Sequence, residues 1–159
     1  MQFRDEITAL ESIAPSTIVV ATARWARYSI EADGDPQLFL YDRRTFKIRA
    51  RRLFGNRGFV NAIRSLDDQI IVSLDTCAVD VDPVHAILRF LHLDLSDASQ
   101  ETITLRGPAT LAVLDTHLAI AERSCMYYEQ GTLWDYDPQN KQMRRIYDGP
   151  HFVYQGDGS

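Results

Sequence analysis

The 159-residue chain has few of the residues that carry catalysis or bind metals. Its four histidines and two cysteines are scattered, and none of them has the spacing of a metal-ligand set. The serines lie outside any Gly-x-Ser-x-Gly turn, and the glycines form no phosphate-binding loop. We therefore expect no catalytic residue, no metal and no cofactor, and we classify the chain as a non-enzyme.

Targeting signals and long apolar runs are also missing. No stretch approaches the roughly 20 apolar residues of a membrane helix, and the N-terminal residues do not form a signal peptide. Cys77 and Cys125 are too few for a disulfide framework, so we expect free thiols and a cytoplasmic or nuclear location. The net charge of −5 argues against bulk affinity for nucleic acid or an anionic membrane.

What the chain does contain is an internal repeat of roughly 50 residues, a period typical of propeller arrays. Each copy begins with two short apolar runs joined by a polar turn, which predicts a β-hairpin. Aspartates such as Asp67 and Asp115 suit these turns because they tolerate strained backbone angles. The predicted strand pairs are 7–13 with 17–21, 60–66 with 69–73, and 109–114 with 117–121.

A second hairpin follows in each copy. The predicted strands are 37–42 with 46–54, 87–94 with 101–105, and 132–137 with 142–147. Asp42, Asp94 and Asp137 each stand where the turn begins, and we expect their side chains to cap it. The repeats therefore read as four-stranded units over 7–58, 59–107 and 108–149 of a single domain spanning 1–159, with a further strand starting at 151–154.

These units resemble WD40-type propeller blades. The residues that carry the resemblance are Leu38–Asp42, Leu133–Asp137 and the strand pair that begins at Val60. The phrases Gly58–Ile63 and Leu66–Val72 are also similar to the propeller family of the cleavage and polyadenylation factor large subunit and the damaged-DNA-binding adaptor. The Gly-His dipeptide of WD40 repeats is missing. The resemblance implies an all-β scaffold that binds proteins.

Three blades are fewer than the four to eight of a closed propeller. Neither terminal repeat shows a polar cap in the sequence, so both ends should expose apolar faces that mark interaction surfaces. We expect an incomplete ring that is closed either by dimerisation with a second copy or by another chain. A β-sandwich, which short strands and regular turns also permit, is the alternative fold.

Two groups of residues are candidate binding sites. Strand-connecting segments rich in arginine and aromatic residues suggest a partner-binding site, because such residues are frequent binding anchors. Its members are Arg24, Trp25, Arg27, Tyr28, Tyr127 and Tyr128. A basic stripe on one hairpin comprises Arg43, Arg44, Lys47, Arg49, Arg51 and Arg52.

The basic stripe has two interpretations. Charged residues on an edge strand prevent unwanted strand pairing, and the same residues could bind RNA or an acidic protein. Strand periodicity predicts that Lys47, Arg49 and Arg51 share one face. Trp134 is expected at the surface, and Asp75, with Asp80 and Asp82, is interpreted as a solvated acid.

The leading hypothesis is a non-catalytic protein-interaction scaffold that binds a protein partner or a second copy of itself. A nucleic-acid-binding subunit that uses the basic hairpin, and a propeller-type hydrolase, are the alternatives.

Overall fold

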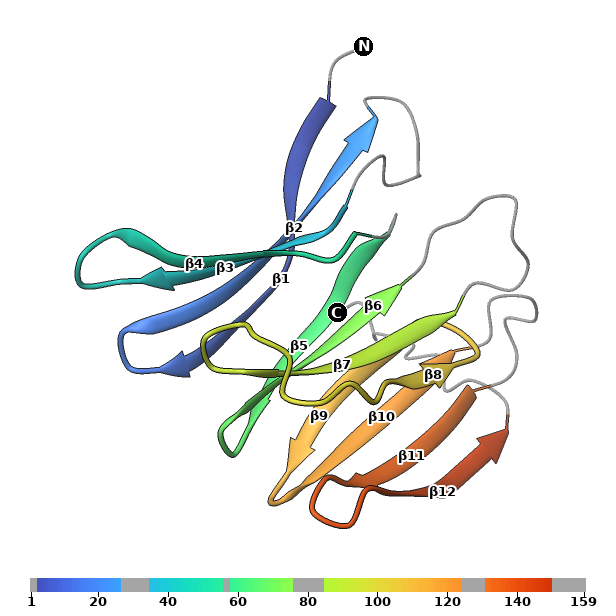
Figure 1. Cartoon of the computed structure of the whole chain (residues 1–159). Coiled ribbons are helices and arrows are strands. Elements are labelled where there is room, and N and C mark those ends of the chain that lie inside the picture. The colour runs from blue at the N-terminus through green and yellow to red at the C-terminus, as the bar shows by residue number, and fades with distance from the viewer. Residues whose placement is uncertain (1–2, 27–34, 56–57, 76–84, 124–130, 150–159) are drawn as a thin grey trace, which may run out of the picture.

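A computed structural model describes residues 3–26, 35–55, 58–75, 85–123 and 131–149, with the backbone alone at 3–5 and 24–26. These residues form twelve β-strands and no helix (Figure 1). The strands are β1 (Phe3–Ala14), β2 (Thr17–Ala26), β3 (Gln37–Asp42), β4 (Lys47–Leu53), β5 (Phe59–Leu66), β6 (Gln69–Asp75), β7 (Ala86–His92), β8 (Ile103–Leu105), β9 (Ala109–Leu114), β10 (His117–Arg123), β11 (Gly131–Asp137) and β12 (Gln142–Gly149). In this part of the chain no helix has the length and hydropathy of a membrane span.

The strands form three separate antiparallel sheets, each made of four consecutive strands paired in chain order. We call β1–β4 sheet 1, β5–β8 sheet 2 and β9–β12 sheet 3. The first strands of neighbouring sheets lie together, because β1 contacts β5 and β5 contacts β9. The sheets therefore stand side by side, with β4, β8 and β12 at the opposite edges (Figure 1). The all-β prediction is confirmed, and three separate sheets do not fit a two-sheet sandwich.

The predicted hairpins are present with ends that mostly agree to within one or two residues. Asp67 and Asp115 adopt positive φ angles of 52° and 56° at the tips of the first hairpins of sheets 2 and 3, as their ability to tolerate such angles predicts. The largest difference is in sheet 1, where the pairing continues to Phe3 opposite Ala26. Residues 151–154, Cys77 and Cys125 lie outside the described part of the chain.

The predicted aspartate caps are confirmed at the turn of all three second hairpins. The Oδ1 of Asp42 accepts hydrogen bonds from the N–H groups of Arg44 and Thr45, at 2.8 and 3.2 Å. The Oδ1 of Asp94 accepts from the N–H of Ser96 at 2.8 Å. Asp137 accepts through Oδ1 from the N–H groups at 139 and 140. These acceptors satisfy backbone donors that the tight turn removes from the strand pairing.

Two apolar clusters hold the sheets together, one at each junction. The junction of sheets 1 and 2 buries Val19, Ala21, Leu38, Leu40, Val60, Ile63, Ile70, Val72, Leu74, Leu91 and Leu95. The junction of sheets 2 and 3 buries Ala62, Leu66, Ile71, Ala86, Leu88, Phe90, Leu105, Ala109, Leu111, Leu118, Ile120 and Tyr136. Sheet 2 is therefore buried on both faces, whereas sheets 1 and 3 each contribute one face to a junction.

Candidate protein interface

The outward face of sheet 1 is apolar across all four strands. Val19, Ala21 and Ala23 of β2 are buried toward sheet 2, so the alternate residues of β2 point away from it. The strand register places Leu10 and Phe39 on either side of Val20. Ile7 and Leu10 are 65% and 61% exposed. We call this set the apolar face: Ile7, Leu10, Ile18, Val20, Phe39, Tyr41, Ile48 and Leu53.

The apolar face occupies the same repeat positions as a buried face of sheet 2. Val72 lies between Ile63 and Arg89 in its sheet, as Val20 lies between Leu10 and Phe39. Ile63 and Val72, the equivalents of Leu10 and Val20, are fully buried where sheet 2 packs on sheet 1. The apolar face thus has the composition of a junction face but is open in the described part of the chain. Contiguous exposed apolar surface of this kind marks an interaction site.

The outward face of sheet 3 differs, because smaller and polar side chains are mixed with apolar ones on it. Ala119 and Asp135 stand at the repeat positions that Ile71 and Phe90 fill at the junction of sheets 2 and 3. His117 Nδ1 lies 2.9 Å from Asp135 Oδ1. We call this set the small polar face: Thr110, Ala112, Leu114, His117, Ala119, Ala121, Leu133, Asp135, Asp137, Gln142, Arg144 and Tyr147. This face therefore combines polar side chains with apolar ones such as Leu114, which is 60% exposed, and it is not a fully polar cap.

The basic stripe lies on the hairpin of β3 and β4, and half of its members are held by contacts within the chain. Arg49 forms an ion pair with Asp42. Arg51 Nη2 donates to Gln37 Oε1 at 2.7 Å, and its guanidinium lies 5.6 Å from the centre of the Phe39 ring. These contacts place Arg51 on the apolar face of sheet 1.

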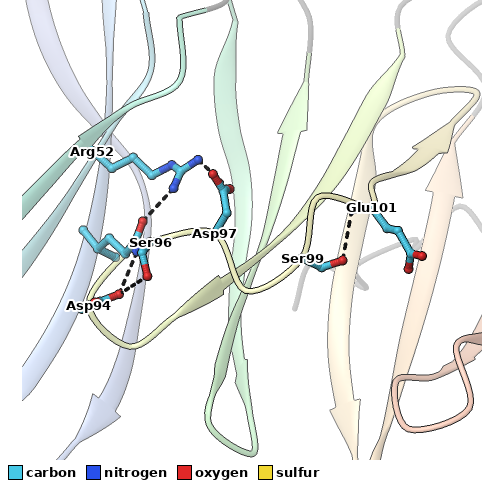
Figure 2. Close-up of polar contacts among 7 residues, drawn as sticks. Arg52, Asp94, Ser96, Asp97, Ser99 and Glu101 are labelled. Carbon is cyan, nitrogen blue, oxygen red and sulfur yellow. Dashed lines mark hydrogen bonds and ion pairs between the residues drawn. The ribbon is translucent and has the colours of Figure 1, made fainter.

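Arg52 points to the other side and links sheet 1 to sheet 2. It donates to the Leu95 carbonyl at 2.8 Å and to Asp97 Oδ1 at 2.7 Å (Figure 2). Both acceptors belong to the connection between β7 and β8. Arg52 is therefore a structural link at the outer rim of this junction.

The prediction that Lys47, Arg49 and Arg51 share one face is wrong. A register shift between Leu40 and Tyr41 leaves Arg49 without a paired residue on β3. Lys47 consequently pairs with Asp42 and Arg51 with Phe39, on opposite faces of the sheet. The exposed members at the hairpin tip are Arg43, Arg44 and Lys47, next to Phe46, which is 79% exposed.

Burial raises the pKa of Asp42, but the N–H groups of Arg44 and Thr45 and the charge of Arg49 outweigh it. The pKa of Asp42 therefore lies below its usual value, and the carboxylate stays ionised at the base of the basic hairpin.

The structure describes only part of the predicted aromatic partner site. Arg24 and Trp25 lie in β2, not in the connection where the sequence had placed them, and their side chains are not described. Arg27, Tyr28, Tyr127 and Tyr128 lie outside the described residues. Trp134 is not a surface aromatic: it is half-buried against the core, and its Nε1 donates to Glu122 Oε2 at 2.9 Å.

Asp75 was not recognised from the sequence as a buried group. Its side chain is only 2% exposed at the end of β6, and neither carboxylate oxygen has a hydrogen-bond partner among the described residues. Burial raises its pKa to about 7, although Arg123 acts in the opposite direction. The interpretation of Asp75 as a solvated acid is therefore wrong. The signal in the sequence was its position directly after the apolar run 70–74.

A groove of about 400 Å³ lies at the outer rim of the second junction. Phe90, Tyr136 and Met143 line it, and Lys141 Nζ pairs with Glu101 Oε2 at 2.7 Å beside it. No group of three or more metal-ligating side chains occurs within the residues that the structure describes. A comparison with protein families gives no match, and a comparison with curated proteins finds no similar sequence.

Proposed function

We propose that the chain is a non-catalytic protein-interaction scaffold, a partial β-propeller whose three sheets are blades. Four-stranded antiparallel sheets of consecutive strands, set side by side with their first strands adjacent, are the arrangement of propeller blades. An array of three leaves two terminal faces without a neighbouring blade. Further β-sheet, from a second copy or another polypeptide, would complete the array.

The observation that carries this proposal is the apolar face of sheet 1. Leu10 is 61% exposed at the position where Ile63 of the next sheet is fully buried. Complete burial of one such side chain stabilises by about 1.5–3 kcal/mol. A protein surface with matching side chains would gain this free energy several times over, which favours a protein partner over a small polar ligand.

A pull-down with the tagged full chain as bait tests the proposal. The prey would be a cell extract supplemented with untagged chain, and the baits would be the wild type, Leu10→Glu and, as a matched control, Phe46→Glu at the exposed hairpin tip. We expect proteins that the wild type and the Phe46 variant retain equally, and that the Leu10 variant loses. If all three baits retained the same proteins, the result would contradict the proposal.

The hairpin tip supports a second candidate function, binding of single-stranded nucleic acid. Arg43, Arg44 and Lys47 are exposed around Phe46, and a cationic surface with an exposed aromatic ring can hold phosphates and stack bases. A titration with single-stranded RNA at rising salt tests it, because phosphate contacts weaken steeply with salt. Salt-dependent binding that Phe46→Ala reduces would support this function, and binding unaffected by the substitution would contradict it.

A further inference from the structure

We propose that the apolar face of sheet 1 binds the small polar face of sheet 3 of a second copy, and that the reciprocal contact forms at the same time. Two chains would then close a ring of six sheets. This inference rests on the proposed function, since it names the partner of the same surface.

The two faces are complementary in size. At the junction of sheets 2 and 3, the rings of Phe90 and Tyr136 lie 5.6 Å apart, centre to centre. By register, Asp135 is equivalent to Phe90, and Tyr41 is equivalent to Tyr136. Where sheet 1 of one copy meets sheet 3 of the other, a phenol would therefore face a small carboxylate. The Tyr41 hydroxyl of one copy can then donate to Asp135 of the other.

The same relation holds for the neighbouring positions. Phe39 is a bulky apolar residue of the sheet 1 face, whereas Ala119 of sheet 3 replaces the larger Ile71 of sheet 2. Interiors pack to a nearly constant density, so a face with bulky side chains requires one with small side chains opposite. Two apolar faces of sheet 1 would instead bring bulky side chains against bulky side chains.

The charged residues of the two faces are also complementary. Arg51 lies on the apolar face above Phe39, and β11 carries Asp135 and Asp137 on the sheet 3 face. His117 and Arg144 also lie on the sheet 3 face, so its charge is mixed. Pairing two sheet 1 faces would bring two copies of Arg51 together, whereas the reciprocal arrangement gives each Arg51 a face that contains carboxylates.

The area of the contact is sufficient for a specific dimer. A face of four strands with about six residues each covers about 400 Å², from the usual strand spacing and rise. Two junctions cover four such faces, about 1,600 Å² in all, which lies within the range of stable interfaces. Six sheets also fall within the usual four to eight of a closed propeller, and the two-fold dimer is the commonest closed symmetry.

Light scattering on the purified full chain, over a range of concentrations, tests this inference. The expected mass is twice the 18.1 kDa of one chain. Ala119→Trp fills the small polar face and should give monomers, whereas Thr104→Trp, an exposed position on β8 of sheet 2, should leave the dimer unchanged. Circular dichroism would confirm that each variant keeps its β-structure.

A charge reversal sharpens the test. Arg51→Glu should raise the dissociation constant at least tenfold, because it replaces a cation that faces carboxylates with another carboxylate. Arg44→Glu, on the same hairpin but away from the face, is the control with the same change of charge.

Three results would overturn the inference. They are a wild type that stays monomeric at every concentration, a dimer that Ala119→Trp leaves intact, and a dimer that Arg51→Glu weakens no more than Arg44→Glu does. A monomer combined with a Leu10-dependent partner in the pull-down would leave the proposed function in place and remove the second copy as its occupant.

Discussion

The two outward faces of the array correspond to the two opposite faces of the repeat, and they differ in chemistry. Sheet 1 presents Leu10, Val20 and Phe39, in a pattern that matches the buried face of sheet 2. Sheet 3 presents Ala119 and Asp135 where sheet 2 has Ile71 and Phe90. The repeat therefore determines the strands and their pairing, whereas the residues on each face determine which surfaces pack on a neighbour.

The largest expected effect separates a buried position of the repeat from its exposed equivalent. Ile63→Ala should lower the free energy of unfolding by about 3 kcal/mol, because it leaves a cavity in a fully buried junction. Leu10→Ala, in chain diluted to the monomer, should change it by less than about 0.5 kcal/mol. Denaturant unfolding of both variants measures this difference. Equal losses of stability in the two variants would contradict the difference in burial between Leu10 and Ile63.

Asp75 gives a smaller effect with a defined pH dependence. The folded chain holds its proton up to a pKa of about 7, whereas the unfolded chain loses it near the usual 3.8. The free energy of unfolding should therefore fall as the pH rises from about 4 to about 7, and stay level above that.

Asp75→Asn should remove this dependence and stabilise the chain by about 2 kcal/mol at pH 8, since the buried charge is gone. Thermal unfolding across the pH range is the measurement. Asp68→Asn, the same substitution at an exposed position in the turn between β5 and β6, provides the matched control. A wild-type pH profile that Asp75→Asn does not alter would show that the carboxyl group is not buried in solution.

Side-chain contacts at the outer rim allow the two existing junctions to be compared. Arg52 links sheets 1 and 2, and the Lys141–Glu101 pair links sheets 2 and 3. Arg52 is only 18% exposed, donates to Leu95 and Asp97, and lies over the Phe54 ring, so Arg52→Ala should destabilise by about 1 kcal/mol.

Lys141 and Glu101 form an exposed pair, and Lys141→Ala should lower the stability less than Arg52→Ala does, because solvent screens the pair. Chemical denaturation of both variants ranks the two links, and a larger loss for Lys141 would reverse the ranking.

The strands could be predicted from the sequence because local chemistry specifies them. Apolar runs on either side of Asp67 and Asp115, and the caps at Asp42, Asp94 and Asp137, act within a few residues. These signals gave the hairpins of all three sheets.

The faces could not be predicted in the same way, because they depend on which sheets pack together. The irregular pairing after Leu40, which separates Lys47 from Arg51, has no distinctive residue in the sequence. The apolar run 70–74 hinted at the burial of Asp75, but which face of sheet 3 stays open depends on how the third sheet packs against the second.

The most direct test of the account asks whether the apolar face is covered when chains associate. Hydroxyl-radical footprinting at low and high chain concentration would follow the oxidation of Phe39 and Tyr41, with Phe46 at the exposed hairpin tip as the internal reference. The account predicts that Phe39 and Tyr41 become protected as the concentration rises while Phe46 does not. Equal oxidation of all three residues at every concentration would contradict it.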